Sequence, residues 1–116
     1  MLLRDKILQV KDIQEETVDL TDIWGVKLLV RGLTGRQRAK LLQNAVSTKG
    51  DVDLERIYPE LVIYSVYDPD TGEQVFKLAD RDALADKSGA ALERITQVAM
   101  RLSGLTPEAV KEAKNA

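Results

Sequence analysis

The stretch DIWGVKLLVRGLTGRQRAKL, Asp22 to Leu41, constrains the fold more than any other part of the sequence. It holds the chain's single tryptophan, then an apolar run, then two glycines around Leu33-Thr34. Val26 to Val30 is mostly β-branched or aliphatic, which predicts a strand. Thr34 suits the N-cap of a helix from about Gly35 to Ser47. The expected apolar face of this helix carries Ala39, Leu42, Ala45 and Val46.

A shorter strand is expected just before this stretch. Thr17 to Leu20 alternates between polar and apolar residues after an interruption by Glu15-Glu16. Trp24-Gly25 lies between the two strands, and the glycine permits a bend there. Residues 1–14 are expected to form a short helix or an arm, because they place apolar residues at helix-like intervals: Leu3, Ile7, Val10 and Ile13.

The middle of the chain leaves two interpretations open. Leu61 to Tyr67 has the β-branched and aromatic density of a strand, whereas Pro59 followed by Glu60 also suits a helix start. Asp68 to Glu73 predicts a turn, because its proline fixes φ and its glycine permits positive φ. Gln74 to Leu78 is expected to be extended and to complete a hairpin.

The last third predicts helices. Asp80 is expected to cap a short helix to about Asp86, and Ser88 a longer one to about Ser103. Gly104 stands where a left-handed C-terminal cap is expected. The stripe of the longer helix carries Leu92, Ile95, Ala99 and Leu102. Residues 106–116 predict a short terminal helix that frays, with Thr106 at its N-cap and Pro107 at its first position.

These elements predict an α+β fold, mostly helical, with a short antiparallel sheet or hairpin. The chain has 116 residues, which predicts a single domain over 1–116. Only 4% of the residues are aromatic, so aliphatic side chains and alanine are expected to fill most of the core.

The composition narrows the classes of function. The chain has no cysteine and no histidine, which removes thiolate chemistry and the side chain most often used as a general base near neutral pH. The formal net charge of −2 argues mildly against nucleic-acid binding. No segment has the length of a membrane span or the core of a signal peptide. We therefore expect a soluble cytoplasmic protein.

Arginines and a lysine cluster at the strand-to-helix junction: Arg31, Arg36, Arg38 and Lys40. A helix N-terminus with arginines nearby can hold a phosphate. The glycine spacing matches neither a Walker motif nor G-x-G-x-x-G, so a solvated helix face is the better interpretation.

Acidic residues suggest two kinds of metal site, and neither fits well. Asp68-x-Asp70-x-Gly72 partly matches a calcium loop, but the glycine is fifth rather than sixth and the twelfth residue is Ala79, not glutamate. The turn is the better interpretation. The pairs Asp51/Asp53 and Asp80/Asp82 suit capping and solubility better than Mg²⁺ or acid–base chemistry.

Each aromatic residue can either pack in the core or stand on the surface as an anchor for a partner. Trp24 is expected in the core, since a lone tryptophan beside a strand usually packs there, although it could anchor a partner. If the segment is a strand, Tyr58 and Tyr64 share one face and Tyr67 lies on the other. The sequence assigns no catalytic, cofactor-binding or metal-binding residue, no cofactor, and no residue to a partner surface. We expect no enzyme.

Several segments, taken in order, carry a family resemblance. They are Val18-Asp19-Leu20 with Trp24-Gly25, Val30 to Arg38, Tyr67 to Phe76, Leu84 to Ser88, Arg101 to Thr106, and Lys114-Asn115 at the end. In this order and spacing the chain resembles the tail assembly chaperones of long-tailed, siphovirus-type bacteriophages from Asp12 onward. It has Asp22-Ile23 where the family often carries proline and glutamate.

The resemblance implies a non-enzymatic role in the host bacterial cytoplasm. Such proteins bind the tape measure protein and keep it soluble while tail tube subunits polymerise around it. A long helical client with exposed apolar stripes needs such cover. A chaperone that must leave is expected to bind through modest, replaceable patches, with many copies compensating by avidity. Self-association is left open by the sequence.

The family often makes a longer form by −1 ribosomal frameshifting near the end of the gene. Ala113-Lys114-Asn115 permits the codons GCA AAA AAC, which contain the slippery heptamer A AAA AAC. If this holds, the longer form shares the chain up to about Asn115 and adds a domain that recruits the tail tube protein.

Two other classes stay open at this stage. One is a minor structural component of the tail that is retained in the virion, which needs a persistent self-interface. The other is a small nucleic-acid-associated regulator that uses the basic cluster, for which steeply salt-dependent DNA binding is the mark.

Overall fold

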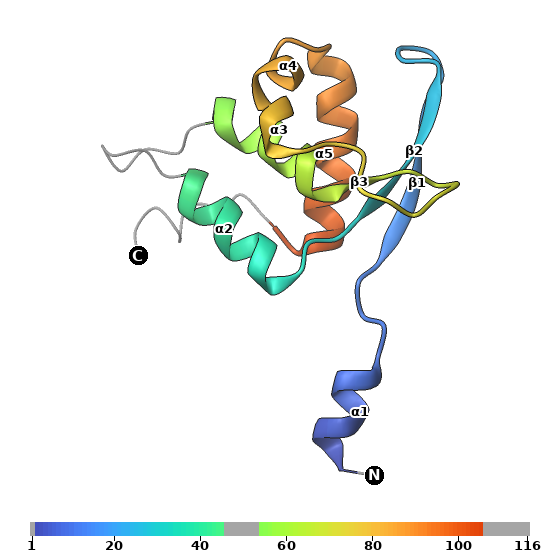
Figure 1. Ribbon diagram of the computed structural model, residues 1–116, viewed down its shortest axis with the longest axis vertical. Coiled ribbons are helices and arrows are strands. Elements are labelled where there is room, and N and C mark those ends of the chain that lie inside the picture. Colours follow the sequence, from blue (N-terminus) through green and yellow to red (C-terminus); the bar gives the residue numbers. More distant parts are fainter. Residues whose placement is uncertain (1, 46–53, 106–116) are drawn as a thin grey trace.

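The computed structural model describes residues 2–45 and 54–105, and within them the chain forms five α-helices, a three-stranded sheet and one 3₁₀ turn (Figure 1). The expected α+β class, mostly helical with a short antiparallel sheet, is confirmed. The elements are α1 Leu3–Gln9, β1 Glu15–Leu20, β2 Val26–Arg31, α2 Gly35–Ala45, α3 Leu54–Ser65, β3 Val66–Tyr67, the 3₁₀ turn Leu78–Asp80, α4 Arg81–Ala85 and α5 Gly89–Ser103. The pair Asp51/Asp53 and the terminal helix expected over 106–116 lie outside the described residues.

The sheet is antiparallel, with the order β1-β2-β3. Strand β1 begins at Glu15, two residues before the expected start at Thr17, so Glu15-Glu16 belongs to the strand and does not interrupt the chain before it. Each glutamate instead finds a cation. Glu15 lies opposite Arg31 in the register and accepts from its Nε at 3.0 Å, and Glu16 accepts from Arg101 of α5 at 2.8 Å. Glu15 is thus compatible with the strand through the opposite charge on the facing position, and Glu16, which faces Val30, through the cation supplied by α5.

The turn between β1 and β2 is built on one carbonyl. The oxygen of Leu20 accepts the N–H groups of Ile23, Trp24 and Gly25 at 3.1, 2.7 and 3.1 Å. Gly25 has φ of 70°, a left-handed conformation that suits glycine. The bend predicted at Trp24-Gly25 is confirmed.

Helix α2 starts with the predicted cap but buries a different side chain. Thr34 Oγ1 accepts the Gln37 N–H at 3.1 Å, and Gln37 Oε1 accepts the Thr34 N–H at 3.1 Å, which makes a capping box. Ala39 is exposed and Leu42 half-buried, whereas Leu41 is almost fully buried. The expected apolar face was therefore only partly right, because Leu42 packs against the core but the most buried side chain is Leu41 and Ala39 is exposed. Its other members, Ala45 and Val46, have side chains outside the described part.

The segment Leu61 to Tyr67, for which the sequence allowed either a strand or a helix, is mostly helix. Helix α3 runs to Ser65, and only Val66–Tyr67 is strand. Pro59 lies inside α3 rather than at its start, so the helix loses one backbone hydrogen bond there. After the turn, Gln74 pairs with Tyr67 through one isolated bridge, which is all that remains of the expected extended strand.

The helices of the last third agree with prediction except at one cap. Ser88 Oγ accepts the Ala91 N–H at 3.3 Å, and Gly104 ends α5 with φ of 67°. Asp80 precedes α4 as expected, but its carboxylate does not cap that helix. Asp80 Oδ2 instead accepts the Lys77 N–H at 2.8 Å and so closes the preceding 3₁₀ turn.

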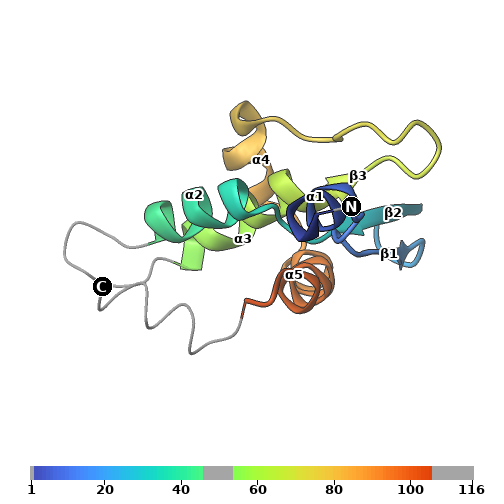
Figure 2. The ribbon, with the colours of Figure 1, turned by 90° about the horizontal axis from the view of Figure 1, so that it is seen from below.

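Helix α5 packs against both the β1–β2 pair and α3, which form a layer along one side of it (Figure 2). Its residues Ile95 and Ala99 are fully buried, as are Leu20, Val30 and Leu61 of the facing elements. The end of β2 comes especially close. A Cβ added to Gly32 would stand 2.7 Å from the Leu102 carbonyl oxygen. Position 32 thus requires glycine because a side chain there would clash with α5, and not because of the backbone angles of Gly32.

A buried carboxylate joins three helices. Glu60 of α3 is 1% exposed and accepts from Asn44 of α2 at 2.8 Å, Tyr64 at 3.5 Å and Arg81 of α4 at 3.3 Å. Burial, and then the charge of Glu60, raises the pKa of the Tyr64 phenol. A charge taken out of water needs such partners, so this node fixes how α2 and α4 sit on α3.

The close approach of β2 to α5 gives a stability prediction. Gly32→Ala forces the strand end and α5 apart, and we expect a loss of about 1–3 kcal/mol in the free energy of unfolding, typical of overpacking. Gly35→Ala is the matched control, because nothing lies within 4 Å of its added Cβ. Urea unfolding of both variants measures the difference, and equal stabilities would contradict the contact.

Candidate functional site

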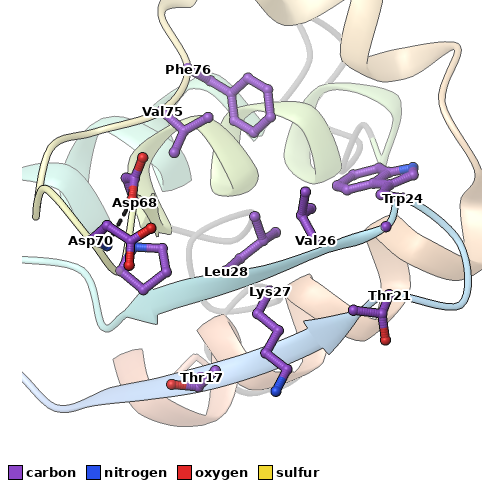
Figure 3. Close-up of a pocket in the computed structure, with 12 residues that line it drawn as sticks. Thr17, Thr21, Trp24, Val26, Lys27, Leu28, Asp68, Asp70, Val75 and Phe76 are labelled. Carbon is purple, nitrogen blue, oxygen red and sulfur yellow. Dashed lines mark hydrogen bonds between the residues drawn. The ribbon is translucent and has the colours of Figure 1, made fainter.

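An apolar groove of about 760 Å³ lies between the β1–β2 hairpin and the turn after β3. Figure 3 shows Val26 and Leu28 on one side and Val75 and Phe76 on the other, with Trp24 at one end. Asp68, Pro69 and Asp70 edge the opposite end, and Thr17, Thr21, Gly25 and Lys27 complete the lining. We call this the Trp24 groove.

The groove exists because β3 is short. Its two residues pair only with Leu29 and Val30 of β2, so β3 does not extend alongside Val26 to Leu28. The chain then leaves the sheet in the turn over Asp68 to Glu73 and returns at Val75, whose N–H donates to the Val66 carbonyl at 3.2 Å. The turn therefore faces the uncovered part of β2 across a gap.

The side chains around the gap are apolar and accessible. Val26 and Val75 are 45% and 43% exposed, while Trp24 and Phe76 are half-buried and pack on the core. The expectation that Trp24 is a core residue was therefore only partly right, because its ring also lines the groove. Apolar side chains that gather around one open groove mark a surface suited to a partner.

The acidic edge of the groove is a turn rather than a calcium loop. Asp68 Oδ1 accepts the N–H groups of Asp70 at 2.7 Å and Thr71 at 3.3 Å, and the Gly72 N–H donates to the Asp68 carbonyl at 2.8 Å. Gly72 has φ of 75°, so the predicted turn is confirmed. Within the described ranges, no three histidine, cysteine, aspartate or glutamate side chains gather in a way that could hold a metal ion.

The turn that carries Trp24 is tied to α5 by Arg94. Its Nη1 donates to the Asp19 carbonyl at 3.0 Å and to Asp22 Oδ1 at 2.8 Å, and its Nη2 donates to Asp22 Oδ2 at 3.2 Å. The Arg94 hydrogen bond holds the pKa of Asp22 below its ordinary 3.8, and Asp22 raises that of Arg94. Hydrogen bonds from Thr21 lower the pKa of Asp19.

The basic residues of the junction are not all brought together. Arg31 pairs with Glu15 and lies over the Tyr67 ring, 4.3 Å from its centroid, while Arg38 lies beside Gly104. Arg36 and Lys40 line a separate cavity of about 340 Å³ with Lys77. Arg36 and Lys40 thus share one cavity while Arg31 and Arg38 lie elsewhere, so the four cations do not form one anion site.

The remaining candidates have structural positions. Tyr58 and Tyr64 lie on α3, so strand alternation does not apply to them, and Tyr67 is the cation–π partner of Arg31. Asp80 closes a 3₁₀ turn and Asp82 lies exposed in the first turn of α4. In the part of the chain that the structure describes, no helix is long and apolar enough to cross a membrane.

Comparisons with known proteins point to one kind of fold, that of a phage tail assembly chaperone. The solved structure of the bacteriophage HK97 tail assembly chaperone matches this chain with a TM-score of 0.59 and 21% sequence identity. The match covers 85% of this chain and 95% of that one. No protein-family model and no curated protein matches the sequence. A likeness at this identity shows the shared fold.

The Arg94–Asp22 pair predicts a pH dependence of stability. Because the folded pKa of Asp22 lies below 3.8, the contribution of the ionised pair is present above that pH and is lost as pH falls through the folded pKa. We therefore expect Asp22→Asn to lower Tm at neutral pH and to approach the parent protein in strong acid. Thermal unfolding at a series of pH values measures this.

The control for this prediction is Arg94→Ala. In that background Asp22→Asn should leave the pH dependence unchanged, since the carboxylate has lost its partner. A parent-variant difference in Tm that stays constant from neutral pH into acid would contradict the role of the pair.

Proposed function

We propose that this protein is a non-enzymatic chaperone of phage tail assembly that binds the tape measure protein and keeps it soluble during tail morphogenesis. The observation that carries the proposal is the fold shared with the HK97 tail assembly chaperone over nearly the whole of that chain. The host bacterial cytoplasm, where tails assemble, is the proposed location. The order of sequence segments that resembles the same family supports it independently of the structure.

The Trp24 groove is the proposed contact for the client. A long helical client carries apolar stripes that must be covered before tube subunits surround it. An open groove with accessible side chains such as Val26 and Val75 can cover part of a stripe and release it again. Such a small contact is weak by itself, so many copies along one client would supply the required avidity.

A longer form is the proposed link to the tail tube protein. Ala113-Lys114-Asn115 permits a slippery heptamer in the gene, and a −1 shift there would append a second segment to the same chaperone domain. The short form would then cover the client while the long form also recruits tube subunits. The dispersed basic residues give no comparable support to a nucleic-acid-binding role.

The groove contact is tested by a charge placed in it. Val75→Asp makes the proposed client surface less apolar, so we expect a several-fold loss of soluble tape measure protein on co-expression. Leu78→Asp is the matched control, because Leu78 is a similarly exposed apolar residue outside the groove. The readout is the soluble fraction of the client, with thermal unfolding to show that both variants fold. Equal losses in the two variants, or none in either, would contradict the assignment.

The longer form is tested with the native gene and its downstream DNA left intact. Expression with an N-terminal tag should give a minor, longer product by blot and mass spectrometry, because a fraction of ribosomes shifts frame. Silent recoding of codons 113–115 should abolish it. A single product from the native gene would remove the frameshift from the proposal and leave the client contact to be judged by the groove variant. Retention of the short form in finished, purified tails would instead favour a structural tail component.

A further inference from the structure

The N-terminal helix exposes an unusual amount of apolar surface. Helix α1 buries none of its residues. The large apolar side chains of residues 2–10 are between 60% and 72% exposed: Leu2, Leu3, Ile7, Leu8 and Val10. A helix of seven residues is marginal in water without tertiary packing. We call residues 2–13 the arm, and its apolar face needs a covering surface.

The arm cannot readily reach the Trp24 groove of its own chain. It leaves the sheet at Glu15, at the opposite end of β1 from the turn that carries Trp24. The Gly32 N–H donates to the Gln14 carbonyl at 2.9 Å and so fixes the direction of exit. Figure 1 shows α1 pointing away from that turn. The six residues of β1 alone span roughly 20 Å, at about 3.3 Å per residue.

The Trp24 groove of another copy matches the arm in two properties, its apolar lining and its opposite net charge. Leu3 and Ile7 lie one turn apart and form an apolar row on α1, which suits a groove lined by valine, tryptophan and phenylalanine. Arg4 pairs with Asp5 at 3.0 Å, which leaves Lys6 and Lys11 against Asp12. The arm thus has a net positive charge, whereas the groove lining holds two aspartates against one lysine.

We propose that the arm of one copy lies in the Trp24 groove of a second copy. The donor and acceptor surfaces differ, so the contact is heterologous, and one copy can give its arm while it receives another. The contact rests on the arm and the groove alone. Its consequence rests on the proposed function: an arm in the groove occupies the client surface, so client and arm compete for it.

Disulfide trapping tests the contact directly, because the chain has no cysteine of its own. Ile7→Cys and Val75→Cys are made in separate preparations of different mass, mixed and oxidised mildly. We expect a heterodimer to form at least about tenfold faster than for Ile7→Cys mixed with Gln97→Cys, since docking raises the effective concentration of the two thiols. Gln97 is the control because it is exposed on α5, outside the groove. Equal rates for the two mixtures would overturn the contact.

Sedimentation velocity gives a second readout. The parent protein should sediment faster with rising concentration, and the Leu3→Asp/Ile7→Asp double variant should stay monomeric while keeping its Tm, because α1 adds nothing to the core. A parent protein that is monomeric throughout the concentration series would overturn the proposal.

Competition is tested by co-expression of the double variant with the tape measure protein. A larger soluble fraction of client than with the parent protein is the result expected from competition. An equal fraction would show that the arm does not compete, and a smaller one that the arm itself binds the client; either would overturn the competition. If the parent protein fails to solubilise the client at all, the proposed function fails, while the trapping experiment still decides whether arm and groove meet.

Discussion

The double packing of α5 is the constraint on which the rest of the structure depends. Its buried stripe, with Ile95 and Ala99 at the centre, contacts both the β1–β2 pair and α3. With few aromatic side chains, the core must close by near contact of backbones and aliphatic groups. Gly32 against Leu102 is the tightest such point, and Arg94 holds the hairpin turn to the outer part of the same helix.

The groove follows from how that packing leaves the sheet. Helix α5 covers one face of the hairpin, while β3 pairs with only two residues of β2. Val26 is therefore apolar but has no strand beside it on the β3 side, and it stays 45% exposed. The turn over Asp68 to Glu73 cannot fill the space, because its own hydrogen bonds hold it in shape. The fold thus presents a small apolar surface, which suits the proposed binding and release of a client.

The sequence predicted features that depend on neighbours in the chain. The Trp24-Gly25 bend, the caps at Thr34 and Ser88 and the turn at Gly72 all depend on local chemistry, and all are found. It missed what depends on distant partners. Glu60 gives no signal of burial because its partners come from two other helices, and the groove was missed because Val75-Phe76 meets Val26 only once the sheet has formed. The available clue to the groove in the sequence was that the apolar pair Val75-Phe76 follows directly after a strong turn.

Amide hydrogen exchange of the Leu3→Asp/Ile7→Asp variant, whose arm leaves the groove open, alone and in complex with the tape measure protein tests the central claim most directly. The account predicts slower exchange on binding in two segments far apart in sequence, residues 24–28 and 68–76, with the exposed end of α4 unchanged. Protection confined to other surfaces, with both groove segments exchanging as in the free protein, would contradict the assignment of the groove to the client.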